Sequence, residues 1–549
     1  MPNASSTRFR KPLIGSKAPF RIYNFFFCIF LFAGSLTLAQ PSLHDGQAHL
    51  FRYRLEKQCG PHLNLTPRLK SVTFQDIADA RTLVRDAQIK AAYLNRNRLA
   101  HPFLAHTSAT SRLLNKSEFN ETTTSVPAIY QLSEQVARAA ALLAELEAIE
   151  SPTQNFTRIN TLEKRAIQWW MGNKEHRGTY PFGDPDYQVF RNVTDAQWAT
   201  DGAVRCTPDG KTDCTKAIEN AMKAGKRCGA GCNGSTTKQA IIYFPPGAYL
   251  ISHTIEIYFG TQMIGDALDP PLIVASSSFI GLGIFSSVGN HTGNRGTDPD
   301  GSVKEYHTSA SNVYRQIRNF QLDLRKAPQT ADGSSPMCGI HYQVGQATSL
   351  SNIVFMMSQP SHYGVYAENG SGGLISDLVI EGGGYGIYGG SQQFTAQRIT
   401  FSNVTSAVVF LSDWGSSWKT INVIGGDTGF KLVSADGKRG IGSIMILDST
   451  FSGTKTAIQT LPASNKPKTG TTGITLENVL FESVGRGVID TIGKEYLPGG
   501  SKSIKYWILG PAYFSQATNY RNYTLGLSDD DIKRSDNMTS PINSRPITA

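Results

Sequence analysis

The stretch that decides the fold runs from residue 362 to residue 423: HYGVYAENGSGGLISDLVIEGGGYGIYGGSQQFTAQRITFSNVTSAVVFLSDWGSSWKTINV. Short β-rich segments bounded by Gly, Ser and Asn each end in a polar residue followed by alternating apolar residues. The signature also occurs before and after this stretch, and the last residues of successive copies are 21 to 30 positions apart. Its copies are Asn352–Phe355, Asp377–Ile380, Arg398–Phe401, Thr420–Val423, Ser449–Phe451 and Asn478–Phe481.

A repeat of this size, made of strands and turns without helical periodicity, is typical of a solenoid whose coils stack their apolar faces. We therefore predict a mainly β protein, a right-handed parallel β-helix over about residues 166–515. A β-sandwich is the alternative, but its strands recur about every 8–12 residues with hairpin turns between them. Asn369-Gly370 is the one convincing hairpin signal in the repeat region.

The segment 40–165 differs from everything after it. Apolar residues at three- and four-residue spacing predict two amphipathic helices over Thr73–Leu99 and Tyr130–Ile149. We expect this helical region to pack on the end of the solenoid, where an uncapped β-helix exposes an apolar edge. A substrate-binding role is the alternative. Beyond residue 515 the β pattern fades, and residues 516–549 are predicted to be a polar tail, the remnant of an inter-domain linker.

Residues 1–39 are typical of a signal peptide, because basic residues precede the apolar run Phe25–Ala33 and small residues lead to a cleavage site after Ala39. The run is short for a membrane anchor, the alternative, so no membrane contact is expected after signal removal. Five of the 53 basic side chains and no acidic ones lie in this segment, which therefore carries half of the formal net charge of +10. The remaining charge is scattered, which gives no support for a nucleic-acid partner.

Eleven Asn-x-Ser/Thr sequons follow the leader and indicate a secreted glycoprotein, extracellular or associated with a cell wall. An even number of cysteines remains after signal removal, which favours disulfides in an oxidising compartment. Cys228 and Cys232 face each other across a Gly-rich loop and are predicted to pair. A zinc site would need further ligands at regular spacing, and none follow, so we predict no metal and no cofactor.

Several phrases of the chain, in this order, resemble the N-terminal β-helix of fungal glycoside hydrolase family 55, whose members are exo-acting β-1,3-glucanases. They are YQVFRNV, YFPPGAYLIS, VYRQIRNFQLDL, GIHYQVGQATSL, ENGSGG and GSQQFTAQRITF. The phrase YFPPGAYLIS, with the short helix expected before it, also resembles the opening of the wider pectate-lyase-like superfamily. The resemblance covers about residues 166–515 and does not extend to the helical region.

This resemblance implies a β-1,3-glucan or related polysaccharide as substrate. In the family, two tandem β-helices enclose the cleft and the second supplies the general-acid glutamate, whereas this chain ends about where the linker should begin. We therefore expect a half-site that hydrolyses slowly alone or completes its cleft by self-association or with a second polypeptide. By motif, Gln392 and Thr420 match an amide and a hydroxyl that help to bind the attacking water, although a serine usually stands at Thr420. A further family glutamine falls on His362 or Tyr363, which is a departure from the pattern.

Glycoside hydrolysis normally needs two carboxyl groups. The carboxyl side chains of the central coils are Glu368, Asp377, Glu381, Asp413 and Asp427. Asp377 occupies the repeated polar position and Asp427 lies in a GGDTG turn, so both have a structural explanation. Glu368 and Asp413 are the catalytic candidates, because Tyr366 and Trp414 beside them offer rings that stack on sugars and raise the pKa of a nearby carboxyl.

Trp414 is therefore a candidate substrate contact, with core packing as its alternative role. Gln343 and Gln346 are either sugar contacts or members of an internal amide ladder. A pectin-acting hydrolase or lyase is the rival enzyme class on the same fold. The Asn-Thr-Asp, Gly-Asp-Asp and Gly-His-Gly phrases of polygalacturonases are absent from this sequence. A non-catalytic carbohydrate-binding or cell-wall protein is the rival outside the enzymes.

Overall fold

The computed structural model describes residues 66–100, 129–150, 169–172, 186–229, 237–288, 312–328, 337–358, 360–368, 370–433, 441–462, 472–511 and 523–527. The predicted signal peptide lies outside these residues, as does most of the predicted tail. Five residues of that tail form the strand β19. The helices are η1 (Pro67–Ser71), α2 (Phe74–Ala100), α4 (Glu134–Glu150), η3 (Ala196–Trp198) and α5 (Thr215–Lys223).

The rest of the described chain is mainly β, as predicted. The strands are β1 (Phe190–Asn192), β2 (Asp209–Asp213), β3 (Ala240–Phe244), β4 (Ala248–Glu256), β5 (Thr261–Gly265), β6 (Leu272–Ser286), β7 (Arg315–Asp323), β8 (Met337–His341), β9 (Ser349–Met356), β10 (His362–Ala367), β11 (Leu374–Glu381), β12 (Tyr385–Ser402), β13 (Ser406–Ile424), β14 (Thr428–Leu432), β15 (Ser443–Ser452), β16 (Thr456–Thr460), β17 (Gly473–Asp490), β18 (Glu495–Pro511) and β19 (Tyr523–Leu527).

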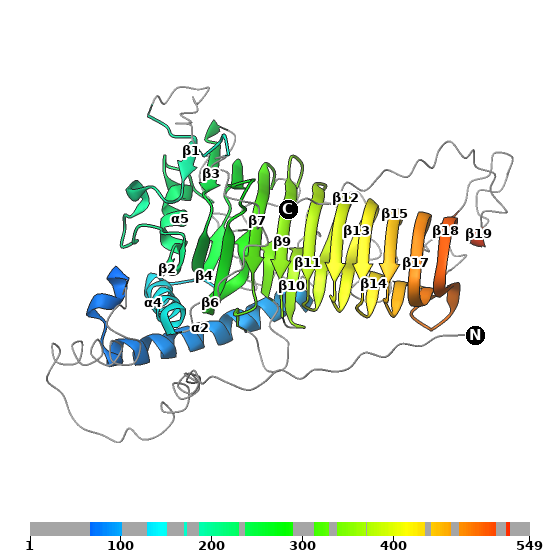
Figure 1. The fold of residues 1–549 in the computed structure, drawn as a ribbon, viewed down its shortest axis with the longest axis horizontal. Coiled ribbons are helices and arrows are strands. Elements are labelled where there is room, and N and C mark those ends of the chain that lie inside the picture. The colour runs from blue at the N-terminus through cyan, green and yellow to red at the C-terminus, as the bar shows by residue number, and fades with distance from the viewer. Residues whose placement is uncertain are drawn as a thin grey trace, which may run out of the picture.

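Two parallel ladders connect these strands from one level of the chain to the next. One ladder joins β3, β5, β7, β9, β11, β12, β13, β15 and β17 in that order. The other joins β4, β6, β8, β10, β12, β13, β14, β16 and β17. Figure 1 shows the strands side by side in one long row, which we call the parallel stack. β18 and β19 end the row with antiparallel pairs.

The register of the first ladder confirms the repeat predicted from the sequence. The apolar residue that closes each signature pairs with its counterpart in the next coil, and all of them are buried. Because parallel pairing aligns equivalent residues, these side chains form a continuous column in the core. The column consists of Phe355, Ile380, Phe401, Val423, Phe451 and Phe481.

The polar residue that opens each signature sits in a turn with a left-handed backbone. Asn352, Asp377, Arg398 and Thr420 have φ values between 52° and 57°. Asx residues tolerate this conformation better than most, and neighbouring copies support one another. Arg398, for example, donates to Asp377 at 2.8 Å. In the fifth copy this place belongs to Asp448, one residue before the Ser449 predicted from the sequence.

The two predicted helices are present, but they do not cover the end of the parallel stack. α2 runs along its flank from the β2 end toward β10 (Figure 1), and α4 packs between α2 and the strands β2, β4 and β6. Gln88 and Asn95 of α2 donate to backbone carbonyls of Ser277 and Gly281 in β6 at 3.0 Å each. These two hydrogen bonds hold α2 against β6 on the flank of the parallel stack.

One disulfide lies wholly within the described residues, and one half of a second is also described. Cys206 and Cys214 form a disulfide with a Cα–Cα distance of 4.7 Å. Cys228 is also disulfide-bonded, and its predicted partner Cys232 lies outside the described residues. Cys338 is a free thiol buried in the parallel stack, so the even cysteine count does not translate into complete pairing.

His362, at the start of β10, makes the stability of the parallel stack sensitive to acid. It is fully buried, and neither ring nitrogen makes a hydrogen bond of good geometry, although the backbone of Ala327 and Pro328 lies near the ring. Burial lowers its pKa from 6.5 to about 4 and outweighs the opposing influence of the Ala327 and Pro328 backbone and of Asp323. The unfolded chain therefore takes up a proton at a higher pH than the folded chain does.

We predict that the free energy of unfolding falls by about 3 kcal/mol through this histidine as the pH drops from 6.5 to about 4. Chemical denaturation of the wild type and of His362→Gln across this range measures the effect. The difference in the free energy of unfolding between the wild type and His362→Gln should shrink as the pH falls, because glutamine does not titrate. A difference independent of pH would show that the imidazole is not held neutral by the fold.

Candidate functional site

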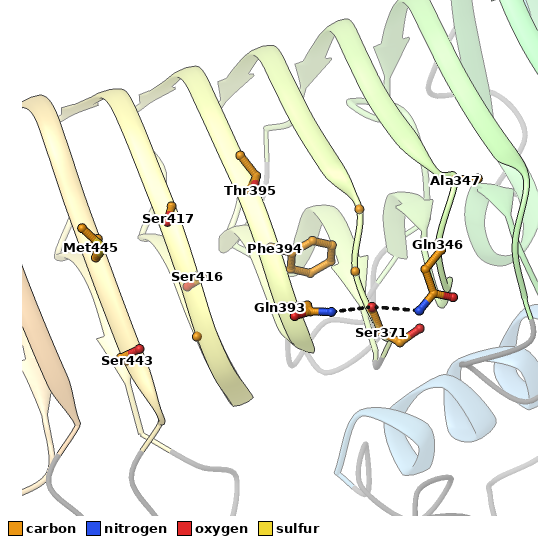
Figure 2. Close-up of a pocket in the computed structure, with 13 residues that line it drawn as sticks. Gln346, Ala347, Ser371, Gln393, Phe394, Thr395, Ser416, Ser417, Ser443 and Met445 are labelled. Carbon is orange, nitrogen blue, oxygen red and sulfur yellow. Dashed lines mark hydrogen bonds between the residues drawn. The ribbon is translucent and has the colours of Figure 1, made fainter.

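A groove of about 520 Å³ crosses the parallel stack from one coil to the next. Figure 2 shows residues from five successive coils along it. With a coil spacing of about 4.8 Å, the five coils span about 19 Å. The lining residues are Gln346, Ala347, Ser371, Gly372, Gly373, Gln393, Phe394, Thr395, Gly415, Ser416, Ser417, Ser443 and Met445.

Small residues keep the groove open. Gly372 and Gly373 have φ values of 143° and 140°, a backbone conformation that side chains other than glycine rarely adopt. A Cβ atom on Gly373 would lie 3.1 Å from the hydroxyl oxygen of Thr348 and 3.3 Å from the ring of Phe394. The pair of glycines in the phrase ENGSGG therefore sets the depth of the groove.

Amides and hydroxyls provide the polar groups of the groove, and all thirteen lining residues are uncharged. Gln346 and Gln393 lie on the coils on either side of Ser371, and each donates to the backbone carbonyl of Ser371 at 3.4 Å (Figure 2). These bonds are long, and amides and hydroxyls both donate and accept. Such a surface suits a neutral ligand that is rich in hydroxyl groups.

Trp414 stands beside the lining residue Gly415 and is 66% exposed. An indole this accessible is not needed for core packing, in contrast to Trp418 of the same strand, which is fully buried. Aromatic faces stack well on the apolar faces of rings. Core packing therefore does not explain the position of Trp414, and its role as a ligand contact stays a prediction.

Asp413, directly before Trp414, is a buried carboxyl without a compensating cation in the described part of the chain. One carboxylate oxygen, Oδ1, accepts from the Gly415 amide at 2.9 Å, and Oδ2 has no hydrogen-bond partner. Burial raises its pKa from 3.8 to about 7, against the opposing hydrogen bonds of Ser416, Gly415 and Trp414. An acid poised near neutrality is a marker of functional sites.

Glu368, the other catalytic candidate, lies away from the groove in a buried ionic cluster. Its Oε2 accepts from Arg98 Nε at 2.7 Å and lies 3.0 Å from His341 Nε2. Burial would raise the pKa of Glu368, but Arg98 and His341 outweigh it and hold the carboxyl below its usual range. Gln343 belongs to the same cluster, because its Oε1 accepts from Arg98 at 3.2 Å. A side chain 1% exposed cannot reach a polysaccharide in this conformation.

The structure separates the two predicted water-binding residues. Gln393 pairs with Gly415, so Gln392 stands level with Trp414 at the edge of the groove. Thr420 occupies the left-handed turn several residues further along the strand, level with Arg398. The carboxyls Asp377 and Asp427 form ion pairs with Arg398 and Lys455, which supports their structural interpretation.

Sequence reasoning missed most of the lining. Ser371, Gln393, Ser416 and Ser417 come together because parallel pairing stacks their coils. The available signal was the alignment of the repeats, which places Gln393 on Gly415 and Phe394 on Ser416. His, Cys, Asp and Glu side chains of the described residues form no group of three that could hold a metal. Among the described helices, none has the length and hydropathy needed to cross a bilayer.

The stacked parallel ladders agree with a pectate-lyase-like fold. A family model described as "Rhamnogalacturonase A/epimerase, pectate lyase-like" matches residues 190–431. These residues therefore form a pectate-lyase-like domain, as predicted.

Curated relatives extend the match beyond that domain. A "Probable glucan endo-1,3-beta-glucosidase" of Arthroderma benhamiae is 38% identical over 66% of this chain and 39% of its own length. A "Glucan 1,3-beta-glucosidase" of Cochliobolus carbonum is 32% identical over 66% of this chain and 44% of its own. A "Non-secreted LysM effector LysM15" of Penicillium expansum is 30% identical over 86% of this chain and 37% of its own. The chain spans less than half the length of these relatives. The matches confirm the predicted resemblance to the pectate-lyase-like glucanases.

The unpaired carboxyl of Asp413 should cost stability above neutral pH. Because its folded-state pKa is raised to about 7, the folded chain keeps a proton that the unfolded chain has already lost. The free energy of unfolding should thus fall by about 4 kcal/mol through Asp413 as the pH rises from 3.8 to about 7. Asp413→Asn should raise the melting temperature at pH 8 and change it little at pH 4.

Asp377→Asn is the matched control, because the pKa of Asp377 is lowered, chiefly by its hydrogen bond to Arg398. Its carboxylate stabilises the fold above its unfolded pKa, so this variant should be less stable at neutral pH. If both variants shift stability in the same direction, the carboxyl of Asp413 is not held in its acid form.

Proposed function

We propose that the chain binds β-1,3-glucan in the groove across the parallel stack and is a glucan-acting protein of the glycosidase type. The observation that carries this proposal is the uncharged lining, to which Gln346, Gln393 and Ser417 contribute amides and a hydroxyl. Trp414 at the edge offers a stacking surface. The curated relatives named as glucan 1,3-β-glucosidases support the choice of polysaccharide.

Pectin is the competing substrate, since the matching family model carries the name of a rhamnogalacturonase. Galacturonate chains are polyanions, and a protein that binds them needs cationic side chains to offset the loss of carboxylate hydration. The lining contains no Lys or Arg. The neutral glucan is therefore the better fit to this groove.

Asp413 is the proposed proton donor. A carboxyl with a pKa near neutrality can protonate the oxygen of a leaving sugar, a step that typically contributes about 10²–10⁴-fold to the rate. Because Asp413 is buried, its side chain must become accessible to do so. Glu368, which the ionic cluster keeps charged, is no longer proposed as a catalyst. A carbohydrate-binding role without catalysis is the second candidate, because no carboxyl belongs to the groove lining.

The proposed architecture is a right-handed β-helix over 166–515, preceded by the helical region 40–165 and a signal peptide over 1–39. The tail 516–549 is proposed to be a polar segment, the remnant of an inter-domain linker. We propose secretion and N-glycosylation on the sequons and the leader. The protein would then act outside the cell or in a cell wall.

Binding to laminarin by isothermal titration calorimetry tests the proposal, with polygalacturonate as the competing ligand. Trp414→Ala and Gln393→Ala should each weaken laminarin binding by about tenfold, because each removes a ring or an amide from the groove. Ile424→Ala is the matched control, since it removes a 47% exposed side chain of the same strand outside the lining. Stronger binding of polygalacturonate than of laminarin would overturn the choice of substrate.

Glucose release from laminarin separates the two candidate functions. If Asp413 is the proton donor, Asp413→Asn should lose turnover by about 10²-fold or more and keep laminarin affinity. If the wild type binds laminarin without releasing glucose, the result would support the carbohydrate-binding role and exclude hydrolysis by this chain. Equal turnover in the wild type and Asp413→Asn would show that this carboxyl takes no part in the reaction.

A further inference from the structure

The C-terminal end of α2 reaches the coils that contain Gln343 and Glu368. Arg98, two residues from the end of this helix, is 2% exposed, although α2 lies outside the matched residues 190–431. Its guanidinium donates to Glu368 at 2.7 Å and to Gln343 at 3.2 Å. One side chain of the helical region thus holds two consecutive coils of the parallel stack.

Both coils continue directly into the groove. Three residues after Gln343 comes Gln346, and three residues after Glu368 comes Ser371, and both line it. Backbone contacts tie the two segments together, since the Ser371 amide donates to the Val344 carbonyl at 3.1 Å. A shift of Gln343 or Glu368 would therefore move the backbone carbonyl of Ser371. This carbonyl accepts hydrogen bonds from Gln346 and Gln393.

The surroundings of Arg98 fix its position. His341 lies 3.0 Å from Glu368, stacks on the ring of Tyr366 and contacts Ser286 Oγ at 2.9 Å. The Tyr366 hydroxyl donates to the Arg98 carbonyl at 3.5 Å. Charge-assisted bonds in a dry interior are directional and hold their partners within a narrow geometry.

From this geometry we infer that Arg98 is a positioning residue for the groove and that the helical region is an integral part of the ligand site. The inference rests on the proposed glucan function and adds a residue that touches no ligand. Arg98 acts through Gln343 and Glu368 on the end of the groove formed by Gln346 and Ser371. The chain would need α2 for affinity as well as for stability.

Three variants in the full chain test this inference: Arg98→Lys, Arg98→Met and Arg98→Met/Glu368→Gln. Arg98→Lys keeps the charge but loses the planar guanidinium whose N–H groups donate to two acceptors at once. Arg98→Met leaves a buried carboxylate without its main partner and should lower the melting temperature. The double variant removes that charge and should recover most of the melting temperature. Arg85→Met is the matched control, because Arg85 lies on the same helix with its side chain 71% exposed.

Laminarin affinity is measured well below each melting temperature. All three variants should bind about tenfold more weakly than the wild type, the double variant included, and the control should bind equally well. If the double variant regains affinity together with its melting temperature, Arg98 contributes stability alone and the inference is overturned.

Hydrogen exchange of the unliganded proteins separates this inference from the proposed function. Amides of 343–347 and 370–373 should exchange faster in Arg98→Lys, while those of 473–490 at the far end of the parallel stack stay unchanged. Unchanged exchange at the groove segments would overturn the positioning role, whatever the ligand. If exchange rises as expected and the wild type does not bind laminarin, the proposed function fails and the positioning role of Arg98 stands.

Discussion

Parallel backbone pairing between coils is the constraint on which the rest of the structure depends. Each coil satisfies its amides and carbonyls through the next, so equivalent residues must stay in register over many levels. This requirement places Phe355, Ile380 and Phe401 in one column and their polar partners in one row of turns. A change at one level is therefore passed to its neighbours.

The groove is a consequence of the same pairing. Its lining comes from uncharged residues at equivalent positions of five coils, and its depth is set by the backbone at Gly372 and Gly373. Two buried carboxyl groups of the central coils have opposite surroundings. Glu368 is fully compensated by Arg98 and His341, whereas Asp413 keeps one oxygen without a partner. A group held at a cost to stability is more readily explained by function than by folding.

The sequence was sufficient to predict the features that depend on local pattern. Alternating apolar residues and the repeated polar turn predict the strands and their order, and helical spacing predicts α2 and α4 to within a few residues. Trp414 and Asp413 were identified because they are neighbours in the chain. The pattern could not show which segments that are distant in sequence lie side by side. Arg98 meets Glu368 across 270 residues of sequence, and neither residue carries a local signal of the other.

The same limit explains the misplaced expectations. An amphipathic pattern shows that a helix packs, but the surface it covers depends on carbonyls such as that of Gly281, which the sequence does not reveal. Thr420 matched a motif by its neighbours in sequence, whereas the ladder register places it level with Arg398 in the turn. Gln393 and Ser416 line the groove because of that register.

The proposed binding mode predicts that one extended glucan chain lies across successive coils. Calorimetric titration with laminarioligosaccharides from the disaccharide to the hexasaccharide tests it most directly. A groove about 19 Å long predicts that affinity rises with each added sugar until the groove is filled and then stays level. Equal affinity for all lengths, or for a cello-oligosaccharide series of the same lengths, would contradict the account.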